Sequence, residues 1–203
     1  MKTSFLLLLT LPLFAQGQSH PVITYQDGLD NCRRIKEEKA KSTTAVSGIT
    51  GPECMCMIGA TFPEFSYTTL EGKQFTTDNL KGKITILNFW MISCPPCIAE
   101  IPGLNNIVQK YGQDDFNYIA FGLDDEKDIR NFLEKHPWRF DQLSSGNTII
   151  LDDLKMFWGF PTTFVLDQDG VIIDAFSGGS ADKGAEKEIE DKLSSTVDKA
   201  LRY

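Results

Sequence analysis

The sequence predicts an α/β fold in which a mixed central sheet is flanked by helices. The first observation is a continuous apolar run at residues 84–90, which is typical of a strand covered on both faces. The second is that helix-like and strand-like segments alternate after this run. The third is a pair of strand-like runs, 162–166 and 171–176, around an Asp-Gln-Asp-Gly turn. Strands joined by helices and then an antiparallel hairpin give a mixed sheet.

Several elements around the first strand follow from local patterns. Residues 65–68 and 73–76 surround a Glu-Gly pair, which predicts an earlier hairpin. A helix is expected over 95–111, where apolar residues recur on one face. A strand is expected over 117–122. Because a helix connects them, the strands at 84–90 and 117–122 should run parallel.

Two further helices complete the predicted domain. The first spans about 125–135, with acidic residues in its first turn and His136-Pro137 after its end. The second spans about 181–201 and carries one apolar stripe, formed by Ile189, Leu193, Val197 and Leu201. We expect helices on both faces of the sheet.

The first 17 residues are typical of an export signal. Lys2 precedes a short apolar run at 5–14, and Ala15-Gln16-Gly17 offers small residues for cleavage. The run is shorter than the ~20 residues of a membrane-spanning helix, although an uncleaved anchor is the alternative. We therefore expect a protein that acts outside the cytoplasm, in the periplasm or cell envelope.

The chain divides into three predicted segments: a signal peptide at 1–17, an extension and linker at 18–57, and one domain at 58–203. The extension shows no convincing periodicity, apart from a short charged helix at 35–41. The net charge of −8 and the absence of a basic stripe argue against a nucleic-acid partner.

A Cys-Pro-Pro-Cys motif at 94–97 lies between the central strand and the helix that follows. At a helix start, unpaired backbone N–H groups and the helix dipole favour the thiolate of the first cysteine. The thiolate is the species that attacks disulfides. A zinc site would need a second pair of ligands at similar spacing, and the two histidines, His20 and His136, do not supply one. The motif predicts redox chemistry on sulfur.

Three more cysteines lie before the domain, at 32, 54 and 56. Because disulfides persist outside the cytoplasm, a bridge from Cys32 to Cys54 or Cys56 is the favoured interpretation. Residues 54–57 (Cys-Met-Cys-Met) also offer four sulfur ligands suited to Cu(I). An electron relay between this pair and the motif at 94–97 is a third interpretation.

From about residue 58 to the end, the sequence resembles the thioredoxin-like superfamily, and within it the exported thiol-disulfide oxidoreductases of the TlpA and ResA type. Residues 88–102 match the signature N-F-W…C-P-P-C-x-x-E-x-P. Residues 159–164 (Gly-Phe-Pro-Thr-Thr-Phe) match the family's cis-proline loop, and Asp169-Gly170 fits the hairpin after it. The resemblance implies a thioredoxin-like fold with an N-terminal hairpin extension.

The resemblance also implies roles for the residues around the motif. Cys94 would attack the target disulfide, Cys97 would resolve the mixed disulfide, and Glu100 would tune the thiols or relay protons. Without the resemblance, Glu100 would be interpreted as a solvated helix residue. Asn88 occupies the place where thioredoxin itself has a buried aspartate, so Glu100 or water must carry the proton of Cys97.

Target contact is implied for residues that surround the dithiol. Pro161 resembles the cis-proline that faces the two sulfurs, and the backbone of Phe160 would pair with an extended target segment. Pro95 and Pro96 lie within the motif, while Trp90, together with Trp158 and Phe160, could form an apolar rim. The alternative for Trp90 is a place in the core.

The predicted function is that of an exported thiol-disulfide oxidoreductase that acts as a reductase of protein disulfides, without a cofactor or metal. The substrates implied include the disulfides of apocytochromes c, with a membrane-bound thiol donor. A net oxidase, a peroxidase and a copper chaperone on the same fold are alternatives. Peroxiredoxins need P-x-x-x-T-x-x-C, but Leu87 and Met91 occupy the Pro and Thr places. Thioredoxin-like copper carriers use C-x-x-x-C and a distal histidine, for which His136 is the candidate.

Overall fold

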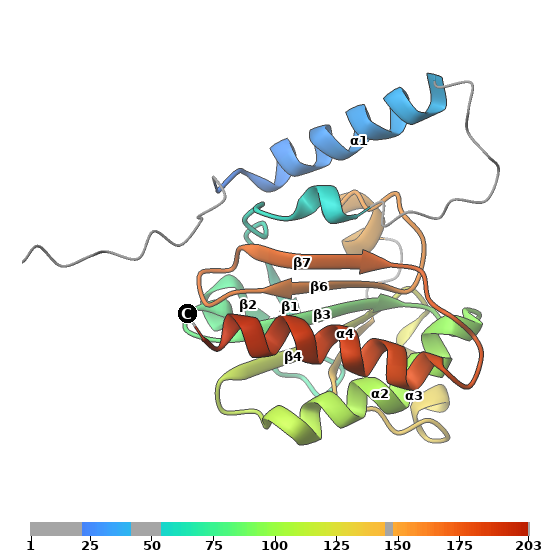
Figure 1. Ribbon diagram of the computed structural model, residues 1–203. Coiled ribbons are helices and arrows are strands. Elements are labelled where there is room, and N and C mark those ends of the chain that lie inside the picture. Colours follow the sequence, from blue (N-terminus) through green and yellow to red (C-terminus); the bar gives the residue numbers. More distant parts are fainter. Residues whose placement is uncertain (1–21, 42–53, 145–147, 203) are drawn as a thin grey trace, which may run out of the picture.

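The structure is a computed structural model that describes residues 22–41, 54–144 and 148–202. Its centre is a five-stranded sheet in the order β5-β4-β3-β6-β7 (Figure 1). The strands are β3 (Ile84–Trp90), β4 (Phe116–Gly122), β5 (Asp141–Ser144), β6 (Thr162–Leu166) and β7 (Ile172–Ser177).

The register confirms the mixed sheet. β3 and β4 run parallel, with Ile84 opposite Phe116, and β6 pairs antiparallel with both β3 and β7. β3 lies at the centre and is buried at all seven positions, as expected of a strand covered on both faces. The predicted hairpin of β6 and β7 is present. β5, which pairs parallel with β4, was not predicted, because Leu143 is the one apolar side chain among its four residues (Asp-Gln-Leu-Ser).

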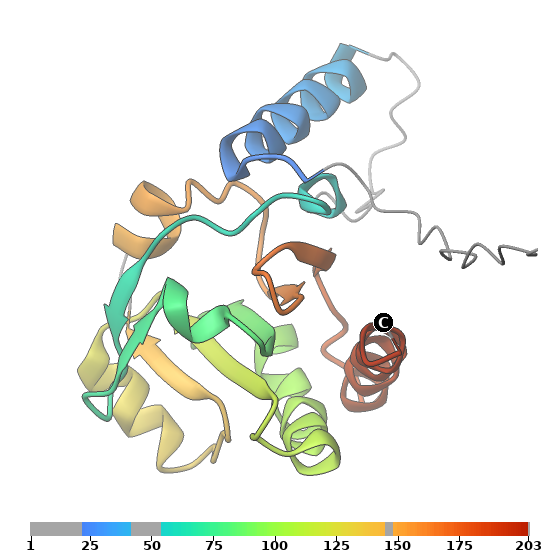
Figure 2. The same ribbon diagram turned by 90° about the vertical axis from the view of Figure 1, so that its left-hand side faces the viewer.

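One face of the sheet is covered by α2 (Pro95–Tyr111), α3 (Glu126–Leu133) and α4 (Ala185–Ala200). Helices α2 and α4 lie side by side (Figures 1 and 2), and their buried apolar side chains share one core cluster with residues of the sheet. The core on this face contains Trp90, Leu104, Ile107, Ile129, Ile189, Leu193 and Val197. These are the apolar stripes that the sequence predicted, so the helices end within a few residues of the expected bounds.

The other face is covered by the N-terminal elements and by the helical turn η3 (Thr148–Asp153). A two-stranded antiparallel sheet, β1 (Ser66–Thr68) with β2 (Gln74–Thr76), confirms the predicted first hairpin, and the turn η2 (Thr77–Leu80) follows it. The core on this face contains Leu29, Met57, Phe75, Phe89, Phe121 and Phe164. Helices therefore lie on both faces, as expected.

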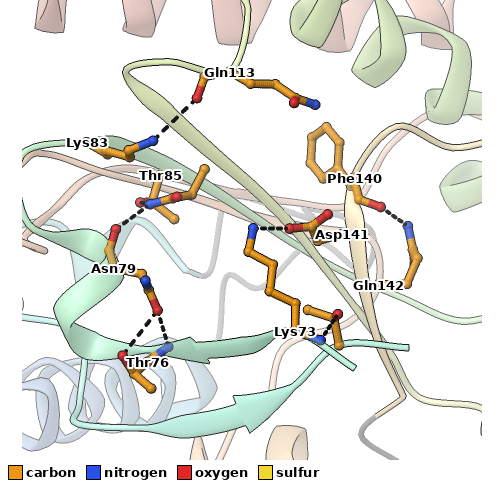
Figure 3. A network of polar contacts seen from close by, with 11 residues as sticks. Lys73, Thr76, Asn79, Lys83, Thr85, Gln113, Phe140, Asp141 and Gln142 are labelled. Carbon is orange, nitrogen blue, oxygen red and sulfur yellow. Dashed lines mark hydrogen bonds and ion pairs between the residues drawn. The ribbon is translucent and has the colours of Figure 1, made fainter. Parts of the chain in front are cut away.

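Polar contacts join the N-terminal hairpin to β5, and the start of β3 to the segment before β4 (Figure 3). The Lys73 ammonium group lies 3.0 Å from the Asp141 carboxylate of β5. Lys83, just before β3, donates to the carbonyl oxygen of Gln113 at 3.4 Å. These contacts lie at the amino ends of β3 and β5, at the end of the sheet opposite the 94–97 motif.

The extension is more ordered than the sequence predicted. Helix α1 spans Tyr25–Lys41, whereas only a short helix at 35–41 was expected, so that prediction was wrong at its start. The buried side of α1 rests on Tyr25, Leu29 and Cys32, three positions at helical spacing, and every residue from 36 to 41 is exposed. A stripe of three is too short to stand out from sequence, and tertiary packing decides the outcome.

A disulfide within the extension holds α1 to the short helix that follows it. It joins Cys32 of α1 to Cys56 of the short helix η1 (Met55–Met57), so Cys56 rather than Cys54 is the partner. Cys54 is completely buried in the core on the sheet face that the N-terminal elements cover. The backbone of Ile23 also pairs with that of Ala60. The predicted signal peptide at 1–17 and the linker at 42–52 lie outside the described residues, and the division at residue 58 stays a prediction. Within the described part of the chain, no helix has the length and apolar character that crossing a bilayer requires.

Candidate active site

The 94–97 motif lies at the carboxyl end of β3, where α/β sheets usually place their chemistry. The loop between β3 and α2 is fixed by the neighbouring end of β4. The N–H of Leu123 donates to the carbonyl of Trp90 at 3.0 Å. The N–H of Ile92 donates to the Asp124 carboxylate at 2.7 Å. Two strand ends therefore set the position of the cysteine loop.

Cys94 and Cys97 form a disulfide with a Cα–Cα distance of 5.3 Å. Cys94 is the N-cap of α2, and its Sγ accepts a hydrogen bond from the N–H of Cys97 at 3.3 Å. Pro95 and Pro96 occupy the first helical positions, where their missing N–H groups cost little. The helix start thus directs its first available N–H and its positive end at the Cys94 sulfur, which favours the thiolate when the bridge opens.

Both cysteines of the motif are buried. Cys94 is 4 % exposed and Cys97 only 1 %. Pro95 is exposed beside them and Pro96 is half-buried. Cys94 is thus the less buried of the two cysteines, and the order in which they attack stays a prediction.

The Phe160–Pro161 peptide bond is cis, as the resemblance implied. Pro161 is buried, Phe160 is half-buried, and Gly159 before them is exposed. The carbonyl of Pro161 accepts from the N–H of Gly178 at 2.8 Å, so this loop is held by the end of β7.

Glu100 lies one turn after Cys97 on α2, at a spacing that places both side chains on the same side of the helix. It is 6 % exposed and is the only acidic side chain that is buried among the described residues. Its Oε2 has no hydrogen-bond partner in the described structure. Burial raises the pKa of Glu100 to about 8, against an opposing effect from Lys192 and with a smaller contribution from Glu188. The solvated-residue interpretation of Glu100 is therefore wrong.

Asn88 lies in the central strand, where its amide donates to the hydroxyl of Thr163 at 3.0 Å. This contact holds β3 to β6. Because an amide does not titrate in the physiological range, Asn88 exchanges no proton. Glu100 is the buried titratable side chain on the helix that carries the cysteines.

The tryptophans belong to the core. Trp90 is fully buried and packs against Phe132 and Trp138, with ring centroids 5.3 and 5.0 Å away. Trp158 is buried on the opposite face of the sheet, against Phe157 and Phe164. For Trp90 the structure thus agrees with the core alternative, and of the three rim candidates Phe160 is the one that is half-buried.

The metal alternatives find little support in the described residues. Among them no cluster of three or more His, Cys, Asp or Glu side chains could hold a metal ion. Cys56, one of the four sulfur ligands considered for Cu(I), is in the disulfide with Cys32. His136 stacks on Phe132, with ring centroids 4.3 Å apart.

Two residues of the site were missed from the sequence. Asp124 directly precedes the predicted helix at 125–135, whose acidic first turn gives it no distinct signal, yet its carboxylate holds the cysteine loop. Gly179 follows β7 and lies against the carboxyl group of Glu100. Its only sequence signal is the Gly-Gly pair at 178–179, which is equally typical of a turn.

Comparison with known proteins agrees with this geometry. The sequence profile of the AhpC/TSA family matches residues 58–175. The chain belongs to the AhpC/TSA family. Within this thioredoxin-like family it is similar to the thiol-disulfide oxidoreductase ResA of Bacillus cereus, with 32% identity over 136 residues that cover 66% of this chain and 78% of ResA.

Solved structures show the same fold. A thiol:disulfide interchange protein of the thioredoxin family from Chlorobium tepidum is 24% identical, with a TM-score of 0.57, and the match covers 70% of this chain and 95% of that one. A secreted disulfide oxidoreductase of Mycobacterium tuberculosis, homologous to DsbE of E. coli, is 23% identical, with a TM-score of 0.54 over 64% of this chain and 95% of that one. The chain is a ResA-like thiol-disulfide oxidoreductase, and Cys94–Cys97 is its CXXC disulfide.

Proposed function

We propose that this protein reduces disulfides of exported proteins through a dithiol–disulfide cycle of Cys94 and Cys97. The observation that carries the proposal is a disulfide at a helix start beside a buried carboxyl group with a pKa of about 8. The helix start makes Cys94 a good nucleophile and leaving group, and the carboxyl group provides a proton site near neutral pH.

The cycle transfers two electrons to the target. The Cys94 thiolate attacks one sulfur of the target disulfide, forms a mixed disulfide with it and releases the other target sulfur as a thiolate. Cys97 then loses its proton and attacks the Cys94 sulfur. This closes the Cys94–Cys97 bond and releases the second target thiolate. The target disulfide is reduced to two thiols, and the enzyme dithiol is oxidised.

Glu100 is proposed to accept the proton of Cys97 in the second step. The structure holds the disulfide, which is the product of that step, and in it the raised pKa of Glu100 keeps the carboxyl group mostly protonated at neutral pH. The same proton can return to Cys97 when a thiol donor reopens the bridge. Asn88, which cannot titrate, leaves Glu100 and water for this role.

Target contact is proposed for the surface around Cys94. Pro95, Pro96 and Phe160 lie at or near the surface there, and the loop of Pro161 offers its backbone to an extended target segment. Trp90 is assigned a supporting role, because its fully buried ring packs behind the end of β3.

Export is the proposed setting. The signal-like segment at 1–17, the similarity to ResA and the secreted relative from Mycobacterium tuberculosis support action in the periplasm or cell envelope. A membrane-bound thiol donor would return the electrons, and the disulfides of apocytochromes c are among the proposed substrates.

A trapping experiment tests the proposal. In a Cys97→Ala variant the mixed disulfide on Cys94 cannot be resolved, so targets should accumulate as adducts that reductant releases. The variant is expressed in its own compartment, and the adducts are identified by mass spectrometry, with Cys94→Ala/Cys97→Ala as the matched control. We expect exported cysteine proteins and one membrane donor. Recovery of no adduct specific to Cys94 would contradict the proposal.

A further inference from the structure

The carboxyl group of Glu100 lies in a space that exists because residue 179 has no side chain. A Cβ built on Gly179 would lie 2.5 Å from Oε1 and 3.4 Å from Cδ of Glu100, and 3.5 Å from Cγ of Pro161. Gly159, in the same cis-proline loop, differs sharply, because a Cβ there would meet nothing within 4 Å. Gly179 is therefore the glycine at which the buried carboxyl group and the cis-proline come together.

We propose that Gly179 is a positioning residue, which admits the Glu100 carboxyl group to its buried place beside the cis-proline loop. The inference rests on the proposed role of Glu100 in the dithiol cycle. It adds a second residue, 79 positions away in the sequence, on which the acid–base group depends.

The collision should move the carboxyl group rather than unfold the protein. No positive φ is found at Gly179, so its backbone conformation is open to alanine. The nearest atom is the far end of a flexible side chain, which can rotate, while α2 and the end of β7 stay in place. The carboxyl group would leave the buried space and gain contact with water.

The charges that face Glu100 come from α4. Lys192 and Glu188 form an ion pair at 2.7 Å, and Lys192 lowers the pKa of Glu100 while Glu188 raises it. Lys192 acts against the larger effect of burial, which raises the pKa, whereas Glu188 adds to that effect. A carboxyl group that leaves the space beside Gly179 loses burial first, so its pKa should fall towards the ordinary value of a glutamate.

The test is an NMR titration of the side-chain carboxyl carbons in the oxidised full-length protein. The Glu100 resonance is assigned by its loss in Glu100→Gln. We expect Gly179→Ala to lower the pKa of Glu100 by about one pH unit or more, and the matched control Gly159→Ala to leave it in place. An unchanged pKa in a folded Gly179→Ala protein would overturn the proposal.

A double-mutant cycle keeps the proposal testable if Gly179→Ala folds poorly. Gly179→Ala should lower the unfolding midpoint in urea when Glu100 is present, and change it much less in a Glu100→Ala background. Equal losses in both backgrounds would overturn the proposal, because the cost would then not involve the carboxyl group. Neither readout needs turnover, so a wild-type protein that failed to reduce disulfides would contradict the proposed function and leave this result standing.

Discussion

The molecule contains two disulfides with the same Cα–Cα distance, 5.3 Å, in different surroundings. Cys94–Cys97 closes a separation of three residues at the start of α2, whereas Cys32–Cys56 closes 24 residues between α1 and η1. The restraint that a bridge places on the unfolded chain grows with the length of the loop. The long bridge is therefore suited to stability and the short one to exchange.

Exposure does not explain the difference, since Cys56 is half-buried while Cys94 is 4 % exposed. The difference lies in the backbone. Cys94 is an N-cap that receives a backbone N–H, but Cys32 lies inside α1, where N–H groups bond to carbonyls one turn earlier. A thiolate leaving from Cys94 is stabilised and one leaving from Cys32 is not. The place of a cysteine in its helix therefore affects disulfide exchange more than the solvent exposure of that cysteine does.

The largest expected effect comes from removing one sulfur of the short bridge. Cys94→Ser should reduce turnover of a protein disulfide to the rate of uncatalysed exchange, because the nucleophile is gone. The double variant Cys32→Ser/Cys56→Ser is the matched control and should keep its turnover at a temperature where it is folded. The insulin-reduction rate measures both. Loss of activity in the control alone would reverse the assignment of the two bridges.

The second effect concerns the buried acid beside the short bridge. Between about pH 4.5 and pH 8 Glu100 is ionised in the unfolded chain and still protonated in the folded one. The contribution of Glu100 to the free energy of unfolding is therefore fully present at low pH. It falls as pH rises, by about 1.4 kcal/mol per pH unit in that window. Glu100→Gln, which mimics the protonated acid, should escape this loss.

Urea unfolding of the oxidised proteins at several pH values measures that difference. The stability of Glu100→Gln relative to the wild type should rise from pH 5 to pH 8 and then level off. Glu134→Gln, at an exposed glutamate, is the control and should follow the wild type. Parallel curves for all three proteins would show that the folded protein does not hold this proton.

The third effect compares the two bridges as restraints. Replacing both cysteines of Cys32–Cys56 with serine should lower the free energy of unfolding by about 3 kcal/mol, and the same change at Cys94–Cys97 by roughly half as much. Denaturation in urea without reductant gives both values. The opposite ranking would show that the Cys32–Cys56 bridge contributes little to the free energy of unfolding and that α1 is held by packing.

The smallest effect concerns the loop that presents Cys94. Asp124→Ala removes the acceptor for the N–H of Ile92 and should cost about 1–2 kcal/mol, with a several-fold loss of turnover. Asp124→Asn keeps an oxygen acceptor and should recover most of the turnover. If both variants matched the wild type, the cysteine loop would be positioned by β3 and α2 alone.

Patterns of local origin were predictable from the sequence. The parallel pair β3 and β4, both hairpins and the stripes of α2 and α4 follow from periodicity and turn residues. The cis bond before Pro161 came from the resemblance, not from the residues themselves. Cys94 and Cys97 could be predicted as the redox pair because their spacing and their place after a buried strand are typical of such a pair.

The missed features depend on contacts between distant segments. The start of α1 rests on three side chains that become a stripe only against the core. The partner of Cys32 could not be chosen between two cysteines two residues apart, because it depends on which way η1 faces. Gly179 and Asp124 act on atoms far away in the sequence, and their neighbours in the chain give no sign of it.

The most direct test of the central claim is the order in which the two bridges open. The folded protein is equilibrated in thiol buffers of decreasing potential, its free thiols are alkylated, and each cysteine is quantified by mass spectrometry. We predict that Cys94 and Cys97 become labelled together while Cys32 and Cys56 stay bridged. Opening of Cys32–Cys56 first, or of both bridges at one potential, would contradict the account.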